Sequence, residues 1–436
     1  MPTTAIRGGT IITPWGEQVG DLVIEANTIA SIGDRAPRAD REIDATGCIV
    51  SPGFVQTHVH LCQTAFSGLA ENLPVIDWLE RWVWPLERAH DAVTSEASAR
   101  WGVAEMLLSG TTSFLSMESA WYVDSAFEAA AELGARATIG KAVMDRREPG
   151  TDLHAETREE AWDDVMRLLH RWHGAEDDRL RLAVSPRAPS AASHEMWNDL
   201  LELATRTDLV IHTHVNENRA QAEHVSGANG MRDVEYLASL GALTRRTVLA
   251  HCVWLTDAER ALLAETGTHV AHCPVANLKL GSGIADVPAL LEGGVNVTLG
   301  TDGAACNNTL DARREMGFAA LVHRAHGGAH AVDARAAFAM ATSSGARALG
   351  YGTRSGRLHA GMRADISVFQ APQFHAGTSE SAIDHLVFSG SAARARTVLV
   401  DGRVVVDDFA LVRADAAGIR RAGASARATL AERIST

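Results

Sequence analysis

The chain carries two different patterns of hydrophobic and polar positions. Residues 1–50 and the segment beyond residue 360 contain short β-branched runs separated by turn residues, as at 28–33 and 397–406. This pattern is typical of antiparallel sheet. Because both ends share it, we expect them to form one small discontinuous β-sandwich domain. The prediction assigns residues 1–51 and 354–436 to this domain, with a terminal helix from Asp415 onward.

The middle of the chain, residues 52–353, alternates apolar runs of strand length with stretches of helical spacing. Residues 95–108 and 193–206 are two of the helical stretches. Eight units of one strand and one helix in roughly 300 residues predict a (β/α)8 TIM-type barrel, an α/β fold with its active site at the carboxyl ends of the strands. The eight strand runs lie at residues 54–60, 111–115, 137–140, 180–184, 209–214, 247–251, 268–272 and 295–300.

Polar side chains mark the ends of several predicted strands. His58 and His60 end the first strand in the stretch FVQTHVH, and side chains two apart on a strand face the same way. His214 ends the fifth strand, His251 ends the sixth, and Asp302 follows the eighth. Because strand ends of a barrel meet at one face, we expect these groups to lie together. Three histidines and one aspartate suit zinc or another borderline divalent metal.

A carboxylate accompanies the predicted metal site. Glu217 lies three residues after His214, just beyond the strand end. A divalent metal lowers the pKa of water towards neutrality, and a nearby carboxylate can take up the proton and pass it on. The alternative is a loop carboxylate paired with Arg219. The spacing of Glu217 from a presumed ligand favours the catalytic role.

Composition and charge exclude several classes of protein. Acidic residues outnumber basic ones by 54 to 40 among 436, for a formal net charge of −14. A negative surface disfavours nucleic-acid and anionic-membrane partners, and no apolar run approaches the length of a membrane span. The five cysteines are scattered, without a Cys-x-x-Cys pair. We therefore expect reduced thiols in a cytoplasmic protein.

Five stretches of the sequence, in this order and spacing, resemble the amidohydrolase superfamily: GFVQTHVHLCQ, HTHVNEN, VLAHCVWL, AHCPVANLKLGSG and LGTDGAACNN. Within it they are similar to the single-metal branch of nucleobase and nucleoside deaminases and triazine hydrolases. The resemblance implies one divalent metal per chain, zinc or alternatively iron, bound by His58, His60, His214 and Asp302.

The same resemblance implies the chemical roles. His251 would contact the attacking water or the developing tetrahedral centre, without necessarily binding the metal. Glu217 would carry a proton to a ring nitrogen, and Asp302 would also accept a proton from the water. Attack at a ring carbon that bears an amino group then expels ammonia.

Residues that could contact the substrate give two different indications. Gln63, three after His60, and Arg187, after the fourth strand, resemble positions in guanine deaminases. Asn277, in NLKLG, and the segment after Asp302 resemble deaminases of S-adenosylhomocysteine and methylthioadenosine. Those enzymes typically have His-Ser-Pro where this chain has Pro-Arg-Ala. A purine base and an adenosine-type nucleoside therefore both stay open as the small heterocyclic substrate.

Tryptophans are frequent after the first strand, at residues 76–85. Trp78 and Trp82 are four apart, on one face of a predicted helix. Most such aromatics are packing residues. Trp78 is the candidate for a side chain that walls the pocket against a flat ring.

We therefore expect a hydrolase that acts on carbon–nitrogen bonds other than peptide bonds, a cyclic amidine deaminase. Two alternatives stay open: an s-triazine-type hydrolase that releases chloride or alkylamine, and a non-catalytic metal- or ligand-binding relative. Glu217 disfavours dechlorination, because chloride departs without a proton whereas an amine needs one. The resemblance also implies a homo-oligomer, a dimer or tetramer.

Overall fold

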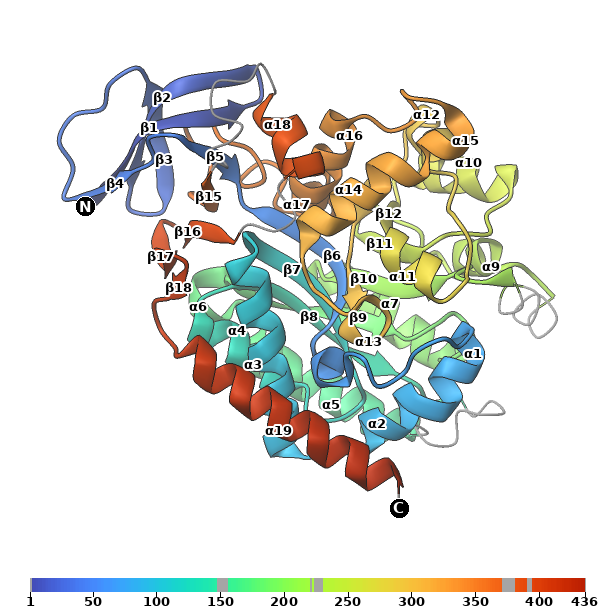
Figure 1. The fold of residues 1–436 in the computed structure, drawn as a ribbon. Coiled ribbons are helices and arrows are strands. Elements are labelled where there is room, and N and C mark those ends of the chain that lie inside the picture. Colours follow the sequence, from blue (N-terminus) through green and yellow to red (C-terminus); the bar gives the residue numbers. More distant parts are fainter. Residues whose placement is uncertain are drawn as a thin grey trace.

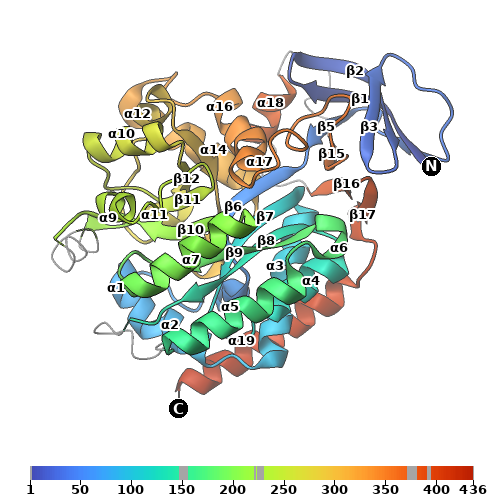
Figure 2. The same cartoon turned by 180° about the vertical axis from the view of Figure 1, so that it is seen from behind.

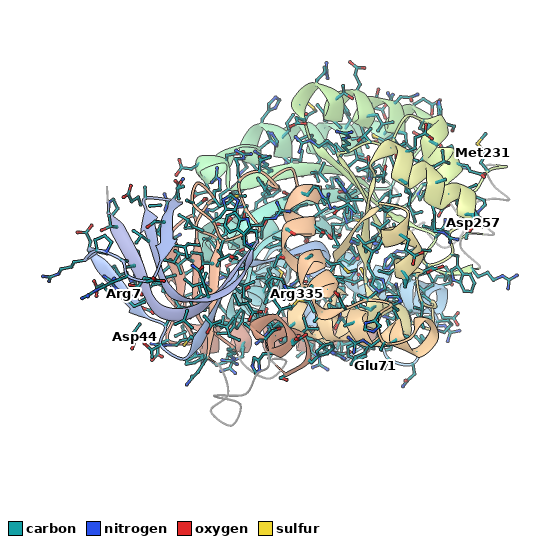
Figure 3. The ribbon with its side chains drawn as sticks, turned by 90° about the horizontal axis from the view of Figure 1, so that it is seen from above. Arg7, Asp44, Glu71, Met231, Asp257 and Arg335 are labelled. Atoms are coloured by element: carbon teal, nitrogen blue, oxygen red, sulfur yellow. The ribbon has the colours of Figure 1, made fainter. Side chains whose placement is uncertain are left out.

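Two sheets organise the structure (Figure 1). The computed structural model describes residues 2–146, 156–219, 222, 230–370, 381–389 and 394–435. One sheet is parallel and forms the centre of the molecule, and the other is mixed and combines strands from both ends of the chain. Figure 3 shows Arg7 and Asp44, which belong to the second sheet, at the opposite end of the molecule from Met231 and Asp257.

The parallel sheet confirms the predicted TIM-type barrel. Its strands follow the order β13-β12-β11-β10-β9-β8-β7-β6-β14. The eighth predicted strand is split into β13 and β14, and β13 pairs with β12 whereas β14 pairs with β6. β13 and β14 together occupy the eighth strand position, and through β14 this position pairs with the first strand, β6. The bounds are β6 (Phe54–His60), β7 (Thr111–Glu118), β8 (Arg136–Val143), β9 (Leu180–Pro186), β10 (Val210–Val215), β11 (Thr247–His251), β12 (His269–His272), β13 (Asn296–Leu299) and β14 (Asp302–Gly303).

The split strand passes very close to β6. A Cβ atom at Gly300 would lie 2.6 Å from the carbonyl oxygen and 2.9 Å from the amide nitrogen of His58. The hydroxyl oxygens of Thr57 and Thr298 are 2.5 Å apart. Only glycine fits at residue 300 without displacing backbone, and this approach brings Asp302 beside the histidines of β6.

Helices cover the outside of the barrel (Figures 1 and 2). Several begin at side-chain caps, such as Asp91, Thr157 and Thr256, which accept a hydrogen bond from the backbone three residues on. The longer ones are α3 (Ala92–Leu108), α4 (Asp124–Leu133), α5 (Arg158–Trp172), α7 (His194–Thr207), α9 (Asp233–Ser239), α10 (Asp257–Thr266), α12 (Val287–Glu292), α14 (Ala312–Val322) and α16 (Ala334–Ala339). Helices were expected at 95–108 and 193–206, and α3 and α7 confirm them.

Short helices lie mostly in the connections between these elements. They are α1 (Val75–Trp78), α2 (Trp84–Arg88), α6 (Ala175–Asp178), α11 (Pro274–Lys279), α13 (Ala304–Asn307), α15 (Arg324–Gly327), α17 (Gly345–Ala348) and α18 (Ala382–Asp384). A 3₁₀ helix, Leu61–Phe66, follows β6, and π-helical turns occupy Leu79–Val83, Met340–Ser344 and His385–Ser389.

The second sheet confirms that both ends of the chain fold together. Its order is β18-β17-β16-β15-β5-β1-β2-β3, with β4 beside β1. β15 runs antiparallel to β5, and β5 runs parallel to β1. The bounds are β1 (Thr3–Thr13), β2 (Gly16–Glu25), β3 (Thr28–Gly33), β4 (Arg41–Asp44), β5 (Cys48–Pro52), β15 (Ile366–Gln370), β16 (Ala395–Val400), β17 (Arg403–Asp407) and β18 (Ala410–Leu411). The domain boundaries at residues 51/52 and 353/354 stay a prediction.

The predicted terminal helix is α19 (Ala416–Ser435), and it lies along α3 of the barrel (Figure 1). Gly423 faces Trp101 of α3 so closely that a Cβ there would lie 2.3 Å from the indole. Leu430 is fully buried in an apolar cluster with Phe66. Among the described residues, no helix combines the length and the apolar character needed to cross a bilayer.

Candidate active site

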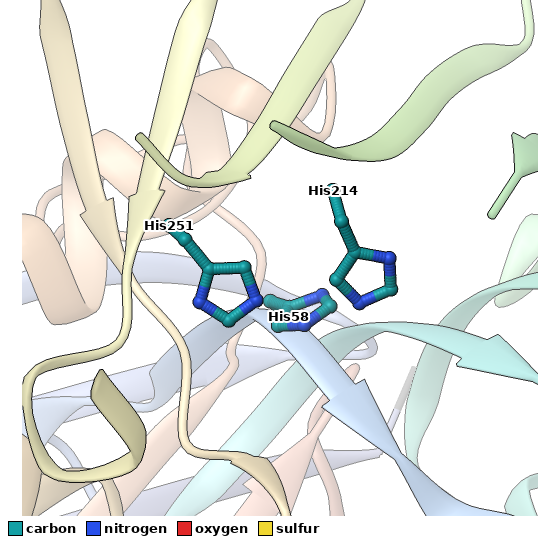
Figure 4. Close-up of side chains that lie close together, drawn as sticks. All are labelled: His58, His214 and His251. Atoms are coloured by element: carbon teal, nitrogen blue, oxygen red, sulfur yellow. The ribbon is translucent and has the colours of Figure 1, made fainter. Parts of the chain in front are cut away.

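The polar groups predicted at four strand ends lie together. His58, His214 and His251 have ring nitrogens within 4.8 Å of one another, and so do the ligand atoms of His58, His60 and Asp302. Figure 4 shows the rings of His58, His214 and His251 gathered at the ends of their strands. His58 is fully buried and Asp302 is only 5% exposed. The barrel therefore brings all five residues predicted at strand ends into one cluster, in which every residue but His214 is buried.

Fixed acceptors orient the imidazoles. The Nδ1–H groups of His60 and His214 donate to the carbonyl oxygens of Met117 (2.5 Å) and Arg187 (2.6 Å). His58 Nδ1 lies 2.8 Å from Nε2 of His212, whose own Nδ1–H donates to the carbonyl oxygen of Val248 at 2.9 Å. Because a carbonyl only accepts, His212 must offer a lone pair on Nε2, and His58 must donate from Nδ1. The Nε2 lone pairs of the three presumed ligands therefore face the cluster.

The separations between these atoms fit a divalent metal. Asp302 Oδ1 lies 3.4 Å from His58 Nε2 and 3.2 Å from His60 Nε2, and His60 and His214 have Nε2 atoms 3.3 Å apart. Ligands bound tetrahedrally to zinc at about 2.0–2.1 Å are about 3.3 Å from one another. The buried His58 Nε2 has no hydrogen-bond partner among the described residues. A cation among these atoms would satisfy it.

Burial and neighbouring charge set the protonation of the cluster. Burial lowers the pKa of His58 to about 4 and holds the pKa of His214 well below its usual value. Both rings are therefore neutral, the form that binds metals. Burial opposes ionisation of Asp302, but His58 and His60 hold its pKa well below the usual range. Asp302 in turn raises the pKa of His60 in spite of burial. A carboxylate beside the neutral imidazoles of His58 and His214 favours a bound cation.

The strand ends turn through left-handed backbone conformations. The φ angles are 48° at Asn216, 72° at His251, 53° at Cys252 and 63° at Asp302. Such conformations cost of order 1–3 kcal/mol each for non-glycine residues and persist only where the surrounding structure imposes them. The Cys252 amide donates to the carbonyl oxygen of Val215, and the Gly303 amide donates to Asp302 Oδ1. These bonds keep the turned backbone in place and direct the site residues into the cluster.

A second carboxylate suited to proton transfer, Glu217, lies beside the cluster. Glu217 Oε2 and Asp302 Oδ2 are each 3.9 Å from His251 Nε2. Burial raises the pKa of Glu217 above its usual value, and its Oε1 accepts a long hydrogen bond of 3.5 Å from the Ser282 hydroxyl. Asn277 lies 2.9 Å from His251 through its side-chain oxygen, which accepts from Nδ1. Asn277, predicted to contact substrate, thus orients His251, and its own buried Nδ2 has no partner among the described residues.

Gln63 and Arg187, also predicted to contact substrate, share a partner. Both side chains donate to the buried carboxylate of Glu87 in α2. Trp78 lies apart from these contacts. It is 4% exposed and packs in the apolar cluster with Phe66. A substrate contact for Trp78 therefore stays a prediction.

Sequence reasoning missed three residues of this site, His212, Ser282 and Glu87. His212 had a signal, because Ile-His-Thr-His in β10 contains a second pair of histidines two apart, which face the same way. Ser282 lies in a loop, where no hydrophobic periodicity of a helix or strand indicates which side chains face the site. Glu87 had none either, since its partners are 24 and 100 residues away along the chain.

Comparisons with known proteins agree with this geometry. The model of the amidohydrolase family matches residues 49–405. A 5'-deoxyadenosine deaminase of Methanothermobacter thermautotrophicus is 40% identical over 406 residues, covering 92% of this chain and 93% of its own. A 5-methylthioadenosine/S-adenosylhomocysteine deaminase of Halobacterium salinarum is 35% identical and covers 99% of both chains.

Solved structures of similar fold carry zinc. An adenosine deaminase from Xanthomonas campestris with bound zinc has a TM-score of 0.90 at 26% identity, over 98% of both chains. An atrazine chlorohydrolase from Arthrobacter aurescens complexed with zinc has a TM-score of 0.91 at 26% identity, over 97% of this chain and 100% of its own. These structures and the His/Asp cluster support a divalent metal here. The chain belongs to the amidohydrolase family and is a hydrolase of carbon–nitrogen bonds other than peptide bonds.

Proposed function

We propose that this enzyme deaminates adenine nucleosides, replacing the 6-amino group of an adenosine derivative with an oxo group and releasing ammonia. The observation that carries the proposal is the position of Glu217. Its buried carboxylate lies 3.9 Å from His251, at the edge of the His/Asp cluster. An amine leaves only after it gains a proton, and Glu217 is placed to supply one. The names of the relatives, deaminases of 5'-deoxyadenosine and of methylthioadenosine and S-adenosylhomocysteine, support an adenine nucleoside over guanine.

The metal-binding role falls to His58, His60, His214 and Asp302, and zinc is the metal that the solved structures favour. A divalent metal bound there would supply acidified water for attack on the ring carbon that bears the amino group. The other residues orient groups and move protons. Asn277 holds His251 so that Nε2 faces the cluster, where it can contact the oxygen that adds to the ring.

Proton transfer uses the two carboxylates. Glu217 Oε2 and Asp302 Oδ2 are each 3.9 Å from His251 Nε2. Asp302 takes a proton from the water, and Glu217 delivers one to the ring nitrogen beside the reacting carbon. The carbon–nitrogen bond then breaks: the departing amino group takes up the proton held by Asp302 and leaves as ammonia, while the added oxygen returns its remaining proton to Glu217 and becomes the oxo group. Burial, which raises the pKa of Glu217, suits it to exchange protons nearer neutral pH.

A substrate panel tests the proposal. The protein is stripped of metal, reloaded with one equivalent of zinc or iron(II), and assayed for ammonia. The panel holds adenosine, 5'-deoxyadenosine, methylthioadenosine, S-adenosylhomocysteine, guanine, an aminotriazine and a chlorotriazine, and chloride release is measured for the last. We expect ammonia from the adenine nucleosides, with loss of activity on chelation and recovery on reloading. Chloride from a chlorotriazine without ammonia from any nucleoside would establish the triazine alternative. Binding without turnover would establish a non-catalytic relative.

Glu217→Gln tests the proton carrier. Because glutamine keeps the shape but cannot exchange the proton, we expect kcat for ammonia release to fall about 10²- to 10⁴-fold. Metal content, measured by plasma mass spectrometry, should equal that of the wild type. The exposed Glu202→Gln is the matched control. Unchanged kcat in Glu217→Gln would remove this residue from the mechanism.

The proposal extends to the assembly and the location of the protein. We propose a homo-oligomer of two or four copies in the cytoplasm, with residues 52–353 as the catalytic domain. All five cysteines are free and buried, as reduced thiols would be. Light scattering on the protein as it elutes from a size-exclusion column tests the oligomeric state. A monomer at micromolar concentration would contradict the proposed oligomer.

A further inference from the structure

Arginines gather around one tyrosine at the end of the barrel where the strands begin, away from the candidate active site. The tyrosine is Tyr351, which follows α17, is 1% exposed and packs with apolar side chains of the barrel strands. Three guanidinium carbons lie 4.8 to 5.8 Å from the centroid of its ring, those of Arg136, Arg181 and Arg354. Arg246, which directly precedes β11, interacts electrostatically with the same tyrosine. We call these four arginines and Tyr351 the arginine cluster.

Three buried donor atoms of the arginine cluster have no hydrogen-bond partner among the described residues. They are Nη1 of Arg136, Nη1 of Arg246 and the hydroxyl of Tyr351. Arg136 donates to Asp365 through Nε at 3.3 Å and through Nη2 at 3.2 Å. Arg246 pairs with Asp208 through the same two nitrogens, with Nε at 2.6 Å. Each guanidinium therefore has one edge paired with a carboxylate and its Nη1 left over, and a buried donor without an acceptor is costly.

The groups that carry these donors lie side by side. Gly350 precedes Tyr351 with a φ of 75°, and a Cβ at Gly350 would lie 2.1 Å from Arg246 Nη1. Arg246 Nη1 therefore lies against the backbone that carries the tyrosine. Arg136, at the start of β8, interacts electrostatically with Tyr351 as well, and its guanidinium carbon is 5.3 Å from the ring centroid. All three donors thus belong to groups in contact with one buried residue.

The charges around Tyr351 do not balance. The ion pairs of the arginine cluster and of Asp401 involve five arginines, Arg136, Arg181, Arg246, Arg354 and Arg363. They involve four aspartates, Asp178, Asp208, Asp365 and Asp401. One positive charge is left over, so one negative charge from outside the chain would balance the group.

We propose that the arginine cluster binds one small monovalent anion, of the class of chloride, between Arg136 Nη1, Arg246 Nη1 and the Tyr351 hydroxyl. An anion only accepts hydrogen bonds, which is what three unpaired donors require. A water molecule would bring two hydrogens that need acceptors, whereas the carboxylates beside the site already accept from the arginines. Sulfate or phosphate would bring four oxygens, more than three donors satisfy. The site goes beyond the proposed function and does not depend on it.

Anomalous scattering from bromide tests the site directly. Crystals of the zinc-loaded enzyme are grown in sodium bromide, and diffraction is measured at the bromine absorption edge. We expect an anomalous peak within hydrogen-bond distance of Tyr351 Oη and of both Nη1 atoms. The same crystals of Tyr351→Phe should lose this peak. Water without an anomalous signal at this position in the wild type would overturn the proposal.

Thermal denaturation tests the anion in solution. Gluconate is replaced stepwise by chloride at constant ionic strength, and we expect the Tm of the wild type to rise roughly 2–5 °C. Tyr351→Phe should lose this rise, because phenylalanine keeps the ring beside the guanidinium groups and removes only the hydroxyl. Chloride that binds at the zinc acts equally on both proteins, so the difference between them reports the arginine cluster. Tyr122→Phe, at a residue 45% exposed, is the matched control and should respond as the wild type does.

The remaining outcomes also decide the question. Equal Tm values of the wild type in gluconate and in chloride, or equal chloride responses in Tyr351→Phe and the wild type, would overturn the proposal. A Tm that rises with sulfate but with neither chloride nor bromide would assign the site to a larger anion and overturn the monovalent one. If Tyr351→Phe fails to fold, the bromide data on the wild type still give the answer.

Discussion

Each imidazole of the His/Asp cluster has its Nδ1 hydrogen directed at an acceptor supplied by the fold. Main-chain carbonyls serve His60 and His214, an amide serves His251, and a second histidine serves His58. Such partners raise ligand basicity and fix ring orientation. The residues proposed as ligands could be predicted from strand ends, whereas most of these partners could not, because a backbone carbonyl is common to every residue type.

His212→Phe tests this arrangement. Without the acceptor at His58 Nδ1, the His58 ring loses its fixed orientation, and we expect metal affinity to fall about 10- to 100-fold. Competition with a chromogenic chelator measures the affinity, and circular dichroism checks the fold. The exposed His170→Gln serves as the control. Equal affinity in His212→Phe and the wild type would contradict the role of His212.

Asp233 links pH to stability at the turn that precedes Glu217. Its Oδ2 accepts from the Asn216 amide at 2.8 Å. Burial, reinforced by Glu259, raises its pKa to about 7 from 3.8. The folded state therefore holds this proton more tightly than the unfolded chain does. Its contribution to stability is fully present below about pH 4 and is lost as pH rises through 7, on the order of 4 kcal/mol.

Asp233→Asn should remove that dependence, because asparagine keeps an oxygen for the Asn216 amide and does not titrate. We expect the free energy of unfolding in urea to vary less between pH 5 and 8 than in the wild type. The exposed Asp163→Asn should leave the wild-type dependence intact. A parallel pH dependence in Asp233→Asn and the wild type would contradict the assignment.

At the scale of elements, apolar runs located all eight barrel strands, because a strand buried on both faces reads as a continuous apolar stretch. The break of the last strand into β13 and β14 was not predictable. It depends on how closely Gly300 approaches the backbone of His58 in β6, more than 200 residues away in sequence. Similarly, the irregularity in β1 between Ile6 and Gly9, where Gly8 has a φ of 69°, interrupts the pairing with β2 but not the strand.

Gly300→Ala tests the close approach. The added methyl group would collide with His58 backbone, so we expect a loss of about 1–3 kcal/mol in unfolding free energy and weaker metal binding. Thermal denaturation with and without zinc measures both effects. Gly33→Ala, where nothing lies within 4 Å of the added atom, is the matched control. If Gly300→Ala left the unfolding free energy and the zinc binding unchanged, the two strands could move apart without a loss of free energy.

At the scale of the whole molecule, a buried ion cluster joins the barrel to the second sheet. Arg136 of β8 is fully buried and lies 3.2 Å from Asp365 and 2.7 Å from Asp401. The Ser355 hydroxyl also donates to Asp365. Removing one partner of a buried pair leaves uncompensated charge. The two sheets are therefore coupled electrostatically as well as through apolar packing.

Arg136→Met should lower the unfolding free energy by about 3–5 kcal/mol, since it leaves the buried carboxylate of Asp365 without its cation, whereas Asp401 keeps Arg363 at 2.6 Å. The double variant Arg136→Met/Asp365→Asn should recover part of the loss, because it removes that buried charge. Calorimetric Tm values compare the three proteins. A double variant less stable than the single one would contradict the electrostatic account.

The pairing of β5 with β15 also has a consequence for synthesis. β5 ends at Pro52 and β15 begins at Ile366, so the ribosome must add about 300 residues before the first strands meet their partner. At roughly 5–20 residues per second, that interval lasts on the order of 15–60 s. During it, β1 to β5 have apolar side chains and an unpaired strand edge exposed. Chaperone demand in the cell should therefore concentrate on the nascent first fifty residues.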